Sequence, residues 1–375
     1  MQLSAEGIKN EILEKNKNIL DQYPGLSIYI FGAARLGRNC AFCCKKKGIQ
    51  VLGFLDNRES IQGDVIDGIT VYSLQDYLDT GAEKPIVIAS LTYWDAIDRQ
   101  LSDNGITSFL HYSILSVWDL PNFPNSNVCF DGIIDETVGN FDKYIKTRDM
   151  LSDHRSRMIF DELIKFRLSL DINFARNAFS LSQPEIYEQY FDLEIISFLA
   201  DEIFVDGGAY KGETSETFIK HLTQQGKCYA EIYLVEPDSG LLETAKRELS
   251  QYPGITYCAA GLSDTCEMSR FAGTGDPGGV INPDGKTEIS LETIDKITKS
   301  KASFIKLDIE GYENPAILGA SETIRNCRPK MAICAYHKSG DMWKLCNTVT
   351  EIREDYKVYL RHYTAGAFET VLYFV

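Results

Sequence analysis

The chain has 375 residues, of which 44% are hydrophobic and 25% charged, a balance typical of a folded globular protein. Its formal net charge of -16 at pH 7 repels phosphate backbones and anionic lipid headgroups, so nucleic acids and membrane surfaces are not expected partners. The length favours two domains over one.

The N-terminal region and the cysteines favour a cytoplasmic location. The first twenty residues lack the apolar core of a signal peptide, and no apolar run approaches the ~18 residues of a membrane span. The ten cysteines lack zinc-site spacing, and Cys40, Cys43 and Cys44 lie where a helix is expected. We therefore interpret them as reduced structural thiols in a reducing compartment.

One local pattern occurs twice along the chain. An apolar strand enters a glycine-bearing turn and a helix, first over residues 27–48 and again over residues 202–222. A second strand with an acidic end follows each time, over 51–57 and 231–238. This order is the βαβ opening of a nucleotide-binding domain, so we predict an α/β protein with two Rossmann-like domains.

The first domain is expected over residues 1–125. Gly32 and Gly37 bound a degenerate glycine loop, and Arg35 within it would suit a phosphate. Asp56-Asn57, after the second strand, would suit a ribose or a base. These five residues form a candidate nucleotide pocket. The alternative is a ligand-free packing or dimerisation module, which leaves a homodimer open.

A helical linker or substrate segment is expected over residues 126–200, with a helix or a pair of helices over 183–199. From residue 201 to 375, strands alternate with helices until the last two strands, which only the turn at 364–367 separates. These two should form an antiparallel hairpin. The sheet is therefore predicted to be mostly parallel with its last strand antiparallel.

The strand ends of this C-terminal domain favour an S-adenosyl ligand over NAD. Asp206 precedes Gly207-Gly208, where a carboxylate disfavours a pyrophosphate but suits a cationic amino acid and a sulfonium. Glu236 ends the second strand, where it can accept hydrogen bonds from a ribose diol, and Asp264 can accept one from an adenine amino group. Thr214 or Ser215 is expected to cap the following helix. The predicted cofactor contacts are Asp206, Gly207, Gly208, Ala209, Tyr210, Gly212, Thr214, Glu236, Pro237, Asp238, Gly261, Leu262, Asp264 and Asp308.

Three residues at later strand ends are candidates for catalysis. His337, with Asp308 and Glu310 nearby, would serve as a general base that takes the proton of a hydroxyl acceptor. Alternatively, His337 only caps its strand and Asp308 only orients the methionyl amine. A carboxylate–carboxylate–histidine trio could also hold Mg²⁺, but nothing in the spacing demands a metal, so none is assigned. Candidate acceptor contacts are Lys338, Arg361, His362 and Tyr363.

Residues 186–375 resemble the FkbM family of methyltransferases. The motifs that carry the resemblance include FVDGGAYKGETS, VEPD, AAGLSD, FIKLDIEGYE and the closing LRHY…ETVLY. The resemblance implies a class I methyltransferase sheet, S-adenosylmethionine as cofactor, and O-methylation of a hydroxyl, often on a sugar or natural product. Tyr210 and Lys211 depart from the Asn and small or apolar residue of many members, which puts the local contacts in doubt.

Residues 26–80 are similar to the N-terminal nucleotide-sugar-binding domains of some sugar acetyltransferases, which implies a nucleotide sugar in the first domain. The whole sequence thus predicts a methyltransferase acting on a saccharide or another small-molecule acceptor. Two other classes stay open: a non-catalytic cofactor-binding scaffold or sensor, and a nucleotide-dependent oxidoreductase that uses the first domain.

Overall fold

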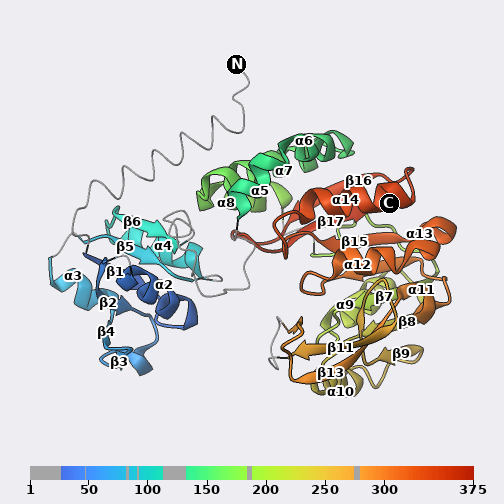
Figure 1. The fold of residues 1–375 in the computed structure, drawn as a ribbon, viewed down its shortest axis with the longest axis horizontal. Coiled ribbons are helices and arrows are strands. Elements are labelled where there is room, and N and C mark those ends of the chain that lie inside the picture. Colours follow the sequence, from blue (N-terminus) through green and yellow to red (C-terminus); the bar gives the residue numbers. More distant parts are fainter. Residues whose placement is uncertain are drawn as a thin grey trace. The chain divides into compact units, whose positions relative to one another are not determined.

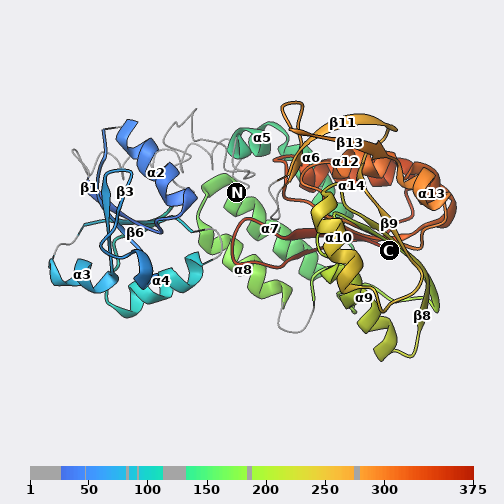
Figure 2. The ribbon, with the colours of Figure 1, turned by 90° about the horizontal axis from the view of Figure 1, so that it is seen from below.

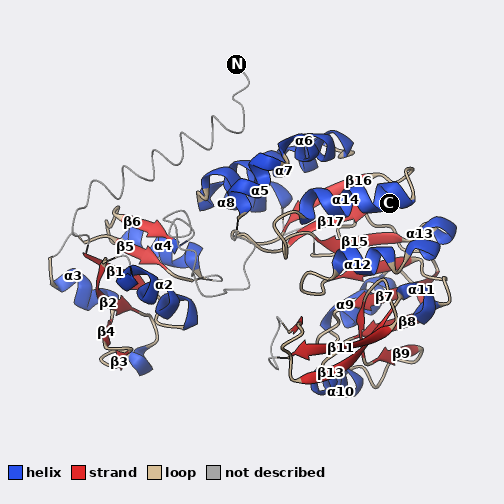
Figure 3. Ribbon diagram, in the orientation of Figure 1, coloured by secondary structure: helices blue, strands red, loops and turns tan. Residues whose placement is uncertain are grey.

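The computed structural model describes residues 27–46, 48–81, 84–90, 93–112, 132–183, 188–273 and 279–375 (Figures 1 and 3). The chain divides into two compact units. Unit 1 comprises 1–139, 162–177 and 365–367, and unit 2 comprises 140–161, 178–364 and 368–375. The predicted boundary between residues 125 and 126 lies outside the described residues. No described helix is long and apolar enough to cross a membrane.

Unit 1 contains a six-stranded sheet in which β1 lies between β2 and β5, parallel to both. In spatial order its strands are β3 (Val65–Ile66), β4 (Ile69–Tyr72), β2 (Gln50–Leu55), β1 (Ser27–Phe31), β5 (Ile86–Ile88) and β6 (Phe109–His111). Its connecting helices are α2 (Arg35–Lys46), the short 3-10 turn η1 (Glu59–Ile61), α3 (Leu74–Asp79) and α4 (Trp94–Asp103). The predicted strand–helix–strand opening is therefore present, with Cys40, Cys43 and Cys44 buried in α2.

The described part of the segment between the two Rossmann-like regions begins at residue 132 and is mainly helical up to residue 182. Its helices are α5 (Ile133–Gly139), α6 (Phe141–Met150), α7 (His154–Ser169) and α8 (Ile172–Ser182). The helix predicted over 183–199 is wrong for the described part, because 188–199 forms turns and irregular chain. Its apolar residues, which suggested a helix face, instead enter the core: Phe191 and Phe198 are buried among the aromatic side chains of unit 2.

Unit 2 contains a seven-stranded sheet that is parallel except for one strand next to an edge. In spatial order its strands are β16 (Val358–His362), β17 (Thr370–Phe374), β15 (Lys330–Cys334), β14 (Phe304–Leu307), β7 (Asp201–Gly207), β8 (Cys228–Val235) and β9 (Ile255–Cys258). The strand β17 runs antiparallel to both of its neighbours. The predicted closing hairpin and the mostly parallel sheet are thus confirmed.

Helices cover both faces of this sheet (Figure 2). Two of them lie on one face, α9 (Glu213–Gln224) and α10 (Ser239–Glu248). The others gather on the opposite face: α12 (Glu313–Leu318), α13 (Ser321–Cys327) and α14 (Asp341–Ile352), with the short α11 (Ile294–Thr298) packed beside α13. The helices lie on different faces because the strands continue from β7 in opposite directions, toward β8 and β9 on one side and toward β14 and β15 on the other, and every crossover is right-handed.

A small second sheet of unit 2 was not predicted from the sequence. Its strands in order are β10 (Ala260–Leu262), β13 (Thr287–Glu292), β11 (Glu267–Ala272) and β12 (Val280–Ile281). Residues 255–262 form two strands in two sheets, β9 and β10, since the chain leaves the main sheet after Cys258.

An aromatic cluster fixes the two central strands of the main sheet. Phe204 of β7 stands opposite Phe304 of β14 in the register, and Phe218 of α9 stacks on Phe204 with ring centroids 4.3 Å apart. All three side chains are fully buried. Burial of such rings contributes about 1.5–3 kcal/mol each, so this cluster holds β7 and β14 in one register and determines which residues meet at their carboxyl ends.

Candidate functional site

The candidate site lies at the carboxyl ends of β7, β8, β14 and β15. The strand β7 pairs with β8 on one side and β14 on the other, so the crossovers diverge here and leave a crevice between them. Ligands of open α/β sheets bind in such a crevice.

The turn after β7 requires glycine for steric reasons. Gly208 has a φ of +70°, and a Cβ there would lie 1.8 Å from the backbone oxygen of Asp308. Gly212 has a φ of +89° and begins α9 as its N-cap without a side-chain bond. The predicted capping role of Thr214 or Ser215 is therefore wrong.

Asp206 is not the free carboxylate that the sequence suggested. It is fully buried beside Lys306, whose Nζ donates to its Oδ1 at 3.1 Å, and Ser215 Oγ donates to its Oδ2 at 2.7 Å. Lys306 Nζ also donates to the carbonyl oxygens of Gly207 and Gly208 at 3.1 and 2.8 Å. Because Lys306 neutralises Asp206, Asp206 does not attract a cationic cofactor as the sequence suggested. The pair instead holds the glycine turn.

Glu236 is buried at the end of β8 and held by two backbone amides. Its Oε2 accepts from Tyr210 N at 3.0 Å and its Oε1 from Asp238 N at 2.9 Å. Burial raises the pKa of the Glu236 carboxyl, and these amides oppose that shift. Each oxygen keeps a further lone pair for a hydroxyl donor. Asp238 has a different role, because its Oδ1 caps α10 by accepting from Gly240 N and Leu241 N.

A narrow cavity of about 30 Å³ lies between the glycine turn and the small sheet. Four predicted cofactor residues line it, namely Gly208, Pro237, Gly261 and Leu262, together with Ile309 and Tyr312 after β14. Ala209 is buried behind the turn. Asp264 is not among the lining residues. It is exposed and accepts from Ser263 Oγ, because the chain has left the main sheet before reaching it.

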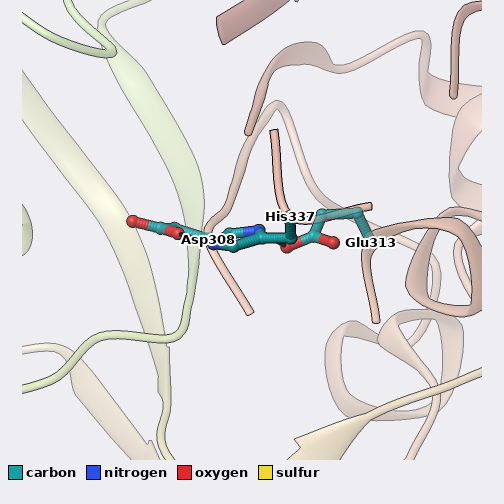
Figure 4. Close-up of side chains that lie close together, drawn as sticks. All are labelled: Asp308, Glu313 and His337. Atoms are coloured by element: carbon teal, nitrogen blue, oxygen red, sulfur yellow. Dashed lines mark hydrogen bonds and ion pairs between the residues drawn. The ribbon is translucent and has the colours of Figure 1, made fainter. Parts of the chain in front are cut away.

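The catalytic candidates converge around one imidazole. Figure 4 shows His337, which follows β15, between the carboxylates of Asp308 and Glu313. His337 Nδ1 lies 2.8 Å from Glu313 Oε1, while Nε2 lies 3.4 Å from Asp308 Oδ1 and 3.6 Å from Glu310 Oε2. Nε2 is buried and has no hydrogen-bond partner among the described residues. Glu310 adopts a left-handed φ of +54°, which a non-glycine residue adopts at a cost.

The charge state of His337 differs from the expectation. Burial would lower its pKa, but Glu313, Asp308 and Glu310 outweigh burial and raise the pKa to about 10. A pKa in this range favours the protonated imidazole at neutral pH, a state that does not favour a general base, and the assignment of His337 as the base stays a prediction. Burial would raise the pKa of Asp308, but His337 and Lys306 lower it. Burial raises the pKa of Glu310, which makes it the stronger base of the two carboxylates.

Besides Glu313 and Lys306, four further residues of this site were not predicted from the sequence. Tyr190 Oη donates to Asp308 Oδ2 at 2.8 Å, and Tyr336 Oη lies 3.4 Å from Asp308 Oδ1 and 3.3 Å from Glu369 Oε1. Gln189 Nε2 donates to Glu369 Oε2. Burial raises the pKa of Glu369 to about 7. Gln189 and Tyr190 come from irregular chain before β7, where no motif marks them. Tyr336 directly precedes His337, and Glu369 is the first residue of the ETVLY motif, so these two could have been found from the motifs.

Two groups of described residues have ligand atoms close enough for a metal ion: Asp308, Glu313 and His337, and Asp308, Cys334 and Glu369. In the first group, His337 Nδ1 and Glu313 Oε1 already engage each other. This arrangement gives no reason to prefer a metal over the protonated imidazole.

Of the four predicted acceptor contacts, two are buried and therefore unavailable to an acceptor, Arg361 and His362, and a third, Tyr363, is partly buried. Arg361 is buried and donates to Asp192 Oδ2 at 2.9 Å and Asp153 Oδ2 at 3.0 Å. His362 is fully buried, with Nδ1 2.9 Å from Thr370 Oγ1. Tyr363 Oη pairs with Tyr373 Oη at 2.6 Å. Their strand-end position suggested exposure, but the packing of the chain over the last hairpin covers them.

Lys338 is the one predicted acceptor contact that is exposed, with its Nζ 5.6 Å from the ring centre of Tyr312.

In unit 1, four of the predicted pocket residues line one cavity, namely Gly32, Arg35, Asp56 and Asn57. Gly37 does not line it and instead packs against the backbone of Gly32.

A seven-stranded sheet with a closing antiparallel hairpin, a glycine turn after its first strand and an acid after its second defines a class I methyltransferase fold. Residues 206–363 match the family model described as the methyltransferase FkbM domain, in agreement with the resemblance that the motifs of this region carry.

The solved structure of methyltransferase FkbM from Methylobacillus flagellatus KT is similar with a TM-score of 0.80 and 22% identity, over 99% of this chain and 97% of that one. This likeness confirms the α/β fold across both units. The CMeT domain of the citrinin polyketide synthase matches at 10% identity over 99% of this chain and 94% of that one, with a TM-score of only 0.31. No curated protein matches the sequence. The predicted similarity of residues 26–80 to sugar acetyltransferases stays a prediction.

Proposed function

We propose that this methyltransferase uses S-adenosylmethionine to methylate a hydroxyl of a saccharide, a nucleotide-linked sugar or a related natural product. One observation carries the proposal: the glycine turn and the His337 cluster share the chain segment after β14. Asp308 N donates to Gly207 O at 3.1 Å, Ile309 and Tyr312 line the narrow cavity, and the Asp308 side chain faces His337. A cofactor cradle and a proton-handling cluster therefore meet at one segment.

The residues of the cradle fit the cofactor. Glu236 is held rigidly with free acceptor capacity, as a ribose diol requires, and the apolar walls of Leu262, Phe271 and Ile281 suit an adenine ring. When bound, the cofactor supplies a methyl group already activated by a sulfonium. The cavity must widen to admit it, since ligand sites of this kind measure about 300–1,000 Å³. Movement of the small sheet that carries Phe271 and Ile281 would provide that space.

The cluster around His337 is suited to orient and deprotonate a hydroxyl. The Nε2–H of the protonated imidazole can donate to the acceptor oxygen, and a carboxylate on either side can accept the hydroxyl proton. Glu310 is the proton acceptor that we propose, because its pKa is raised and its side chain is partly exposed. Asp308 and His337 align the hydroxyl, which is most of what an in-line displacement needs from the protein.

Replacing Glu236 with Ala should weaken S-adenosylhomocysteine binding by roughly 1–3 kcal/mol, because a ribose diol would lose its acceptor. Titration calorimetry on the folded variant measures this. Glu231→Ala is the matched control: Glu231 lies on the same strand but pairs with Tyr233 and Thr256, so binding should not change. Equal affinity in wild type and Glu236→Ala would remove Glu236 from the site.

The decisive test of the function pairs binding with turnover. The protein should bind S-adenosylmethionine and S-adenosylhomocysteine but not NAD, and should transfer a tritiated methyl group to a member of a panel of sugars, nucleotide sugars and small hydroxylated metabolites. Cofactor binding without transfer to any panel member would favour the scaffold or sensor. NAD binding without a response to the sulfonium compound would favour the oxidoreductase. Activity lost to a chelator and restored by Mg²⁺ would add a metal to the site.

A further inference from the structure

Unit 1 contains a cavity of about 670 Å³ at the carboxyl ends of β1, β2 and β5. Because β1 pairs with β2 on one side and β5 on the other, this is the point where the crossovers of the sheet diverge. The volume lies within the range of small-molecule and cofactor sites. The FkbM domain match begins at residue 206, so this cavity belongs to a part of the chain that the methyltransferase reaction does not explain.

The loop beneath the cavity brings the first turn of α2 close to β1. Gly32 has a φ of +112°, and a Cβ there would lie 2.6 Å from the backbone oxygen of Ala89. A Cβ on Gly37 would lie 1.7 Å from the oxygen of Gly32. Only this pair of glycines lets the twelve-residue helix α2 start directly at the cavity, and the positive end of a helix dipole favours an anion there.

Two guanidinium groups line the cavity. Arg35 begins α2, is exposed, and forms no ion pair with any described residue. Arg58 is half-exposed and is fixed by Asp56, whose Oδ1 accepts from Nε at 2.9 Å and whose Oδ2 accepts from Nη2 at 2.8 Å. Guanidinium groups held in this way suit phosphate oxygens.

Asp56 cannot take the ribose-binding role that the sequence suggested. Besides Arg58, it accepts from the backbone amides of Ala33 at 2.9 Å and of Arg58 at 3.0 Å, so both of its oxygens are occupied. Asn57 is likewise engaged, in a reciprocal amide pair with Gln100. The polar recognition in this cavity is therefore cationic, and the acid positions a cation.

Apolar side chains complete the lining of the cavity. Tyr93, Ile97 and Leu36 contribute to it, and Tyr93 has 69% of its surface exposed, an unusual state for a large ring. An exposed ring in a cavity that two guanidinium groups also line offers a stacking face for a planar base.

We propose that this cavity binds a nucleoside diphosphate, free or sugar-linked, with its phosphates at Arg35, Arg58 and the start of α2 and its base against Tyr93. The inference does not depend on the proposed methyl transfer, since the two sites lie in different units.

The test is titration calorimetry of the full chain with ADP and UDP, in the presence of saturating S-adenosylhomocysteine so that ADP cannot report on the Glu236 site. Binding of at least one nucleotide is expected. Arg35→Ala and Tyr93→Ala should each weaken it by about tenfold or more, as expected for loss of a charge-assisted contact or a stacking face. Both side chains are exposed, so the variants should fold, which thermal unfolding checks. Arg99→Ala is the matched control: Arg99 is an exposed arginine of the same unit that pairs with Asp95 outside the cavity.

Three results would overturn the proposal. The first is that neither nucleotide binds the wild type, and the second is that Arg35→Ala binds as tightly as the wild type. The third is that inorganic pyrophosphate binds as tightly as both nucleotides, which would leave the base without a role. Glu236→Ala separates the two sites, because it should weaken S-adenosylhomocysteine binding and leave UDP binding as in the wild type.

Discussion

Lys306→Met is expected to lower the free energy of unfolding by about 3–5 kcal/mol, because it leaves a buried carboxylate without its partner. Lys306 and Asp206 have side-chain exposures of 2% and 0%, and burial alone would lower the pKa of Lys306. Asp206 and Asp308 outweigh burial and raise it, so the ammonium stays charged. Equilibrium denaturation with urea measures the loss.

Two further variants separate this effect from a general loss of packing. Asp206→Asn combined with Lys306→Met removes both charges and should recover a large part of the lost stability. Lys296→Met is the control, since Lys296 and Glu292 form an exposed pair whose removal should cost less than about 1 kcal/mol. If the double variant is no more stable than Lys306→Met alone, the charge pair is not the origin of the effect.

Lys306→Met should also affect the cofactor site, because Lys306 donates hydrogen bonds to the carbonyl oxygens of Gly207 and Gly208. The double variant, with stability restored, should still bind S-adenosylhomocysteine more weakly than wild type. Lys306 is therefore a positioning residue for the glycine turn rather than a cofactor ligand.

Features that depend on local chain order could be predicted from the sequence. The glycine turn, the acid at the end of β8 and the closing hairpin each arise from residues that are neighbours along the chain. The strand ends of a parallel sheet also meet at one edge whatever the exact register, which is why Asp308 and His337 were placed together correctly.

Features that depend on register and packing were not predictable. Asp206 and Lys306 are 100 residues apart, and only the alignment of β7 with β14 shows that they pair. Arg361 resembled a surface contact because its partners, Asp153 and Asp192, lie in segments with no motif. The short strands of the small sheet have too few residues to show an alternating pattern. The charge of His337 depends on Glu313, which closes the FIKLDIEGYE motif and reaches the imidazole only through the packing of α12 beside β15.

His337→Gln is expected to lower turnover at neutral pH by about 10²–10⁴-fold, the contribution of a positioned proton acceptor. The reason is indirect. The imidazolium holds down the pKa of both Asp308 and Glu310, so a neutral glutamine allows the carboxylates to take up a proton and lose their basicity. Activity of the variant should therefore recover as the pH rises, and the acidic limb of its pH–rate profile should lie at higher pH than that of the wild type. Methyl transfer to the acceptor found in the panel measures this, with S-adenosylhomocysteine affinity close to that of wild type.

The free energy of unfolding of wild type and of His337→Gln gives a second readout, which needs no methyl acceptor. The pKa of His337 rises from 6.5 to about 10 on folding, so its charge stabilises the native state fully below pH 6.5, and this contribution is lost as the pH rises through about 10. The difference in unfolding free energy between wild type and His337→Gln should thus shrink steadily across that interval. Nitrogen-detected NMR of the imidazole should show both ring nitrogens protonated at pH 8. A neutral imidazole at pH 7, or a variant whose activity stays low at every pH, would return His337 to the role of general base.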